Sequence, residues 1–133
     1  MNTEKTNFGR YGKIFQEGLV QLIFQDRPFA DQITEVLDVH FLELEYLQVV
    51  LKKILDYRDR YQVHPSFAAF DTILNTELCS EEQIIQTQVK EYFEKIHISE
   101  LSDVGYIKET SLDFCRKQNL KEAMLKSVSL LQN

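Results

Sequence analysis

Apolar residues recur every three or four positions through most of this chain, which is the spacing of amphipathic α-helices. No stretch shows the strict alternation typical of a half-buried strand, and no segment repeats another. We therefore predict an all-α fold, a compact bundle of about five to six helices with a longer C-terminal helix. The spacing places the helical segments over residues 10–25, 27–37, 43–61, 67–75, 81–96 and 103–131.

The first helical segment has an apolar stripe that we expect to face the core. Gly18 falls on the same face, where glycine costs about 1 kcal/mol relative to alanine in a helix. We expect another helix to approach closely at this position, which would account for the glycine. The residues of the stripe are Tyr11, Ile14, Phe15, Leu19, Leu22 and Ile23.

The last helical segment carries two apolar faces that point in nearly opposite directions at about 100° per residue. One straight helix cannot lay both faces on the same core. Either the helix breaks near residues 117–119 and folds back, or its second half leaves the core and packs on a partner chain. The first face consists of Val104, Ile107, Phe114 and Cys115. The second face is our candidate protein interface and consists of Leu120, Ala123, Met124, Val128 and Leu131.

The 133-residue length is that of a single domain. We predict a disordered polar tail over residues 1–9 and one helical domain over residues 10–133. Within that domain we expect a head over residues about 10–102 and a projecting helix over residues about 103–131.

The net charge of −6 argues against strong direct nucleic-acid binding by this domain. Two cysteines without a CxxC motif predict reduced, partly buried thiols in a cytoplasmic protein. No segment resembles a signal peptide, and no apolar run approaches the roughly 20 residues needed to span a membrane. We expect a cytoplasmic location, in the host cytoplasm if a phage encodes the chain.

Motifs for nucleotide, metal or catalytic chemistry are missing from the sequence. There is no GxxxxGK[ST] loop and no GxGxxG, and none of His40, His64 and His97 belongs to an HxxxH or HExxH pattern. We therefore expect no catalytic, cofactor-binding or metal-binding residue in this chain, and no cofactor.

Two acidic pairs and a basic flank have both a functional and an ordinary interpretation. The acidic pairs are Glu35 with Asp38 and Glu81 with Glu82, which have the residue types of acid/base pairs. We prefer the interpretation that they are charges on solvated helix faces and in first helical turns. Basic residues such as Lys117, Lys121 and Lys126 line the last helix. They are either ordinary surface lysines or a flank that meets phosphate or an acidic protein surface.

The order of these features resembles the N-terminal domain of DnaB-type replicative helicases, most closely the shorter versions of T-even-type bacteriophages. The resemblance covers residues 15–131. It rests on three elements: an aromatic and acidic junction between the first two helices, a long helix closed by a turn and a Pro-started helix, and a tyrosine-to-basic pattern in the last helix. These are Phe24, Asp26 and Phe29; residues 57–74; and Tyr106, Arg116 and Lys117.

The resemblance implies a helical head followed by a helical hairpin, of which the segment 103–131 would be the first helix. Hairpins of neighbouring subunits would pair into a collar above a ring of six ATPase domains, and the collar would offer a surface to primase. A helicase loader is a further expected partner. The expected function is thus a non-catalytic assembly and primase-interaction domain that self-associates as a dimer or higher oligomer.

The chain departs from this family because it ends at Asn133, before a second hairpin helix or an ATPase domain. It is therefore either a piece of a helicase or a free-standing relative. The main alternative function is a stand-alone helical adaptor or regulator that binds a replication or host protein. An enzyme or metal-binding bundle and a nucleic-acid-binding helical domain are the other two classes that remain open.

Overall fold

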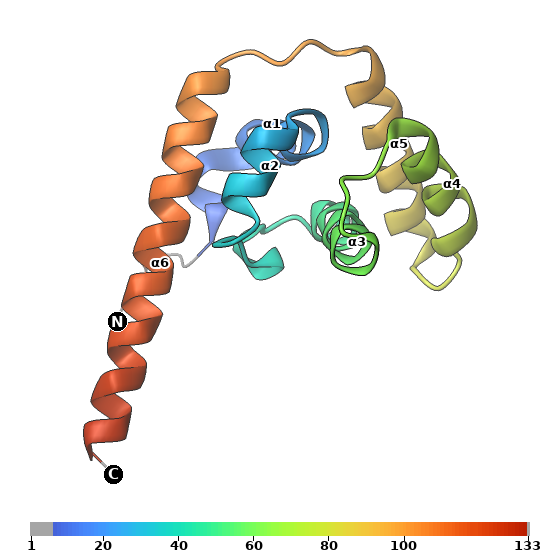
Figure 1. The fold of residues 1–133 in the computed structure, drawn as a ribbon. Coiled ribbons are helices and arrows are strands. Elements are labelled where there is room, and N and C mark those ends of the chain that lie inside the picture. The colour runs from blue at the N-terminus through green and yellow to red at the C-terminus, as the bar shows by residue number, and fades with distance from the viewer. Residues whose placement is uncertain (1–6, 133) are drawn as a thin grey trace.

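The computed structural model describes residues 7–132, and over that range the chain forms α-helices and short 3₁₀ helices without any strand (Figure 1). The all-α prediction is confirmed. The elements in chain order are η1 (Phe8–Tyr11), α1 (Gly12–Gln25), α2 (Arg27–Ile33), η2 (Val39–Phe41), α3 (Glu45–Tyr61), α4 (Phe67–Glu77), α5 (Gln83–Ile98) and α6 (Val104–Gln132).

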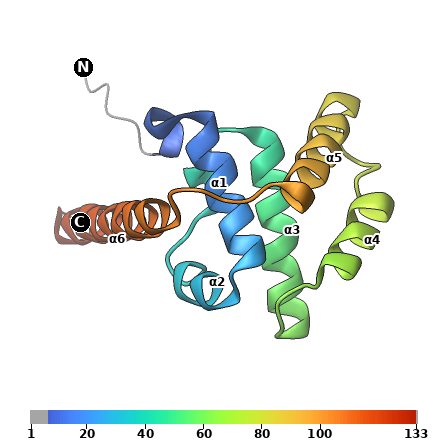
Figure 2. The ribbon, with the colours of Figure 1, turned by 90° about the horizontal axis from the view of Figure 1, so that it is seen from above.

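Helix α1 lies at the centre of the head, which comprises η1 to α5. It packs against η1, α2, α3 and α6, while α5 packs against α3 and also forms hydrogen bonds with α1. Figure 2 shows α1 and α3 side by side, with α4 and α5 beyond α3 and with α6 on the opposite flank. The connection from α5 to α6, residues 99–103, crosses over α1 in both views.

Burial covers every face of α1 from Phe15 to Phe24, rather than a single stripe. The prediction that Ile14 is buried is wrong, because its side chain is 87% exposed. The reason is that the first turn, residues 12–14, extends beyond the elements that cover the rest of α1. A helix that is buried on all sides is typical of the centre of a domain.

The predicted disordered tail over residues 1–9 requires a correction at its C-terminal end. Phe8 is fully buried in η1, and its ring centroid lies 4.4 Å from that of Phe114 and 5.8 Å from that of Phe15. Asn7 caps η1, because its side chain accepts a hydrogen bond of 2.8 Å from the Gly9 N–H. Burial of this ring outweighs the polar character of its neighbours. Residues 1–6 lie outside the described residues.

Most helices begin or end one or two residues away from the predicted position, and the end of α2 differs by four residues. Helix α2 ends at Ile33 rather than at Leu37, and Asp38 caps the following η2 by accepting a hydrogen bond of 2.8 Å from the His40 N–H. Helix α5 begins at Gln83, and its N-cap residue Glu82 makes no side-chain capping bond.

Three polar side chains of α1 are buried, and each of them fixes another segment. The Gln16 Oε1 atom accepts hydrogen bonds from the N–H groups of Glu43 (2.8 Å) and Leu44 (3.3 Å), which positions the start of α3. The Gln21 side chain donates to the Ser99 carbonyl at 3.1 Å and so holds the connection that crosses α1.

Glu17 is the third of these residues and joins α1 to both α3 and α5. Its carboxylate accepts a hydrogen bond of 2.6 Å from the Tyr46 hydroxyl and one of 2.9 Å from Lys95. Burial raises the pKa of Glu17, but these two partners outweigh burial and bring the pKa below its usual value. The Tyr92 hydroxyl donates to the Glu17 backbone carbonyl at 2.5 Å.

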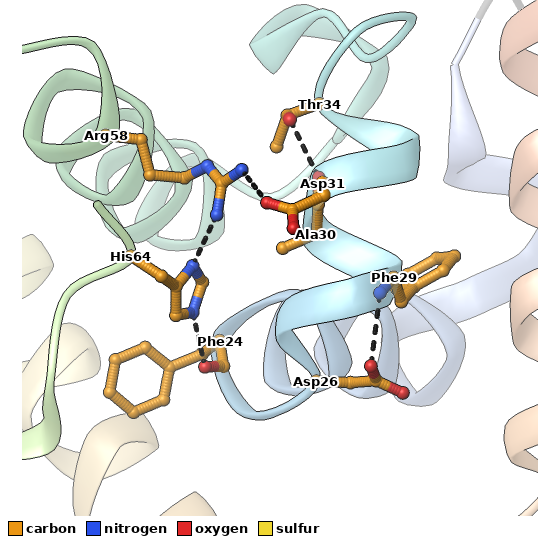
Figure 3. A network of polar contacts seen from close by, with 8 residues as sticks. All are labelled: Phe24, Asp26, Phe29, Ala30, Asp31, Thr34, Arg58 and His64. Carbon is orange, nitrogen blue, oxygen red and sulfur yellow. Dashed lines mark hydrogen bonds and ion pairs between the residues drawn. The ribbon is translucent and has the colours of Figure 1, made fainter. Parts of the chain in front are cut away.

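The turn between α3 and α4 is held to α1 and α2 by a polar network (Figure 3). Arg58 donates to the Nδ1 atom of His64 at 2.7 Å and to Asp31 at 2.5 Å. The Nε2 atom of His64 lies 2.7 Å from the Phe24 carbonyl. Guanidinium groups only donate and carbonyls only accept, so His64 is neutral with its proton on Nε2.

We predict that Glu17→Ala lowers the free energy of unfolding by about 2–3 kcal/mol, because it leaves the buried Tyr46 hydroxyl without its acceptor. Urea unfolding followed by circular dichroism measures the change. Glu17→Gln is the matched control, since its amide oxygen still accepts from Tyr46. Equal losses in both variants would mean that the hydroxyl bond contributes nothing.

We also predict that His64 makes stability depend on pH. Burial and the neighbouring Arg58 lower the pKa of His64, so the folded state binds a proton less readily than the unfolded chain. The contribution of His64 to the free energy of unfolding is therefore complete above the ordinary histidine pKa of about 6.5. This contribution is lost as the pH falls below that value. Urea unfolding between pH 8 and pH 5 should show the wild type losing stability relative to His64→Gln. Parallel curves would contradict this prediction.

Candidate interaction surface

Helix α6 is one unbroken helix of 29 residues, about 43 Å long at 1.5 Å per residue. The alternative of a break near residues 117–119 is therefore excluded. Figure 1 shows α6 running along the head and then continuing beyond it. We call residues 120–132 the outer half of α6.

The inner part of α6 is fixed to the head by close packing. A Cβ atom at Gly18 would lie 3.0 Å from the Ile107 Cδ1 atom, which confirms that the glycine allows a close approach of another helix. Lys108 pairs with Asp26 at 2.8 Å, and this hydrogen bond is the main reason why the pKa of Asp26 is lowered. The residues of this part that are buried are Ile107, Ser111, Leu112, Phe114, Cys115 and Gln118.

Near the end of its buried part α6 is held to the head by Asn119, whose side chain donates a hydrogen bond of 2.9 Å to the Val36 carbonyl. Beyond this residue every side chain of α6 except the half-buried Lys121 is exposed through residue 132. No glycine or proline interrupts the helix after Gly105. Good helix formers such as lysine, glutamate, alanine and leucine favour its continuation.

The five interface residues that we predicted from sequence all lie on the outer half and are all exposed. Leu120 and Leu131 are eleven residues apart, close to three helical turns, so the stripe between them runs nearly parallel to the axis. Four of the five residues form this apolar stripe and Ala123 lies beside it. The exposed fractions in the stripe are Leu120 62%, Met124 60%, Val128 49% and Leu131 87%.

Sequence reasoning missed two further apolar side chains on the outer half. Leu125 and Leu130 are both exposed, although they lie off the main stripe. Leu125 completes a shallow hollow with an almost wholly apolar lining. The hollow is bordered by two lysines and is lined by Lys117, Leu120, Lys121, Met124, Leu125 and Val128.

A second surface feature is a groove on the head with a volume of about 730 Å³. One wall comes from the segment 35–40, which leads from α2 into η2, and the other from one face of α3. We call it the α3–η2 groove. Glu35 and Asp38, which we had considered as an acid/base pair, both line it. Sequence reasoning missed the groove, because its walls are separate in the chain.

Of the groups considered for chemistry, Glu35, Asp38 and His40 line the same groove. Among residues 7–132 no group of three or more metal-ligand side chains lies close enough to hold an ion. Both cysteines differ from the predicted half-burial, since Cys115 is fully buried and Cys79 is exposed. Burial raises the pKa of the Cys115 thiol to about 12, which keeps it protonated near neutral pH.

None of the helices over residues 7–132 has the length and apolar character that a membrane-spanning helix needs.

Comparisons with protein-family models, with curated proteins and with solved structures find no match to this chain.

We predict that the outer half of α6 is the least protected helical segment when the protein is dilute. A helix whose side chains are almost all exposed opens locally at little cost in free energy. In hydrogen–deuterium exchange at low protein concentration, the amides of residues 122–131 should exchange on the order of 100-fold faster than those of residues 108–118. Equal protection of the two segments would show that the outer half is covered even in dilute solution.

Proposed function

We propose that this chain is a non-catalytic assembly domain whose outer half of α6 binds apolar surface on another copy of the chain. The observation that carries the proposal is the row of large apolar side chains, Leu120 to Leu131, on a helix segment that the head leaves uncovered. Contiguous exposed apolar surface is typical of protein-interaction sites. The described residues offer no competing cluster of metal ligands.

The resemblance to replicative helicase N-terminal domains supports a finer version of this proposal. In that version the projecting helix forms collar contacts between the subunits of a hexameric DNA helicase, and the assembled collar offers a surface to primase. A head with one long helix leaving it agrees with the head and first hairpin helix that the resemblance implies. ATP hydrolysis and unwinding would then belong to another part of the helicase.

The expected strength of the contact is modest. Burying the side chains of the apolar stripe contributes several kcal/mol at about 25 cal/mol per Å² of apolar surface. Loss of translational and rotational freedom offsets much of that gain. We therefore expect an association that depends on concentration, not a permanent dimer.

Sedimentation equilibrium of the chain over a concentration series tests this proposal. We predict that the wild type associates and that Met124→Asp raises the dissociation constant by about tenfold or more, because a buried unpaired carboxylate is costly. Circular dichroism should show that the head of this variant stays folded.

The matched control is Ser129→Asp, which places the same charge on an exposed position away from the apolar stripe. It should associate like the wild type. A wild type that stays monomeric at high concentration would contradict self-assembly and would favour the stand-alone adaptor. Unfolding of Met124→Asp would contradict the exposure of Met124.

A further inference from the structure

We infer that the outer half of α6 of one copy binds in the α3–η2 groove of a second copy. The inference rests on the proposed self-association and names the surface on which the apolar stripe packs. It differs from pairing of two α6 helices, in which the same surface of both copies would be used. Four properties of the two surfaces support the inference: their apolar content, their charge, their length and their position.

The floor of the groove is apolar and only partly covered by the head. Four side chains, all packed against the core on one side, line it on the other: Val36, Val39, Val49 and Leu55. A concave surface of this kind suits the apolar face of an amphipathic helix. The apolar stripe of α6 has that character.

The charges of the two surfaces are opposite. Four carboxylates line the groove, namely Glu35, Asp38, Glu45 and Asp56. Lys52 is the single lysine or arginine among the described lining residues, and it pairs with Asp56 at 3.5 Å. On α6 the residues that border the apolar hollow are Lys117 and Lys121. Complementary charges of this kind favour one partner and fix its register.

Lys117 already pairs with Asp113 at 2.9 Å within α6. Both side chains of this pair are exposed, and an exposed pair at this spacing contributes little to stability. Lys117 can therefore leave Asp113 and pair with a carboxylate of the groove at little cost in free energy.

The lengths of the two surfaces agree. The face of α3 that lines the groove runs from Glu45 to Asp56, and the apolar stripe runs from Leu120 to Leu131. Each spans eleven residue steps, about 16 Å at 1.5 Å per residue. The stripe thus fills the groove along the whole of its α3 wall.

The position of the α3–η2 groove relative to α6 requires that the outer half bound in it belongs to a second copy. Asn119 is the one residue of α6 that lines the groove of its own chain, and the outer half then continues away from the head (Figure 1). A straight helix cannot turn back into a groove that it has just passed. The contact joins two different surfaces, so it is either exchanged reciprocally between two copies or repeated from copy to copy in a closed ring or an open helical filament.

A charge-swap experiment by sedimentation velocity tests this inference. The groove variant is Glu35→Lys with Glu45→Lys, and the helix variant is Lys117→Glu with Lys121→Glu. Each variant alone should dissociate about tenfold or more readily than the wild type, because like charges then meet at the contact. An equimolar mixture of the two should associate again, since lysines of one groove meet glutamates of the other helix.

The outcomes separate the inference from the proposed function. A groove variant that associates like the wild type would overturn the inference, while loss of association in Met124→Asp would still support self-assembly through α6. A mixture that stays dissociated would also overturn the inference. A wild type that never associates would overturn both. Thermal unfolding of each variant verifies that the head is intact, and Glu45→Gln provides a milder groove variant that should weaken association in the same direction.

Discussion

The structure depends on the burial of α1 on all of its sides. A buried helix that carries Gln16, Glu17 and Gln21 has to satisfy their polar groups within the protein. An unpaired buried polar group costs about 1–3 kcal/mol, and a charged group costs more. Each of these side chains finds its partners on a different segment: the start of α3, the hydroxyl and ammonium groups of α3 and α5, and the connection before α6. The requirements of one central helix thereby fix the position of most of the head.

The direction of α6 follows from the same helix. The connection held by Gln21 delivers the chain to the far flank of α1, and Gly18 lets Ile107 approach closely there. Two residues of α6 then hold it to the head. Lys108 pairs with Asp26, and Asn119 donates a hydrogen bond to the Val36 carbonyl. Because these points lie about eleven residues, or roughly 16 Å, apart along a continuous helix, they fix both its position and its direction. The outer half continues in that direction with exposed side chains from residue 122 to residue 132.

The sequence predicted the helical segments and both apolar faces of α6 well, because these depend on the spacing of apolar residues within one segment. It also predicted the close approach at Gly18, since glycine within a buried face has few other reasons to occur. It failed where distant segments decide the outcome. Phe8 stands in a polar stretch and is buried only because Phe114 and Phe41 lie against it. Gln16 and Glu17 have the residue types of a solvent face, and their burial depends on partners that are 27 to 78 residues away.

A projecting helix and a groove of matching length and opposite charge on one chain have a further consequence for the strength of assembly. Binding usually loses free energy in ordering the partners, and here much of that ordering has already occurred on folding. The inner part of α6 nucleates the helix, so the outer half extends an existing helix and needs no costly first turn. The groove walls belong to the packed head, in which Val49 and Leu55 are held by the core. In the proposed contact, two prepared surfaces would therefore associate with less loss of freedom than two flexible segments, and a short apolar stripe would be sufficient for reversible binding.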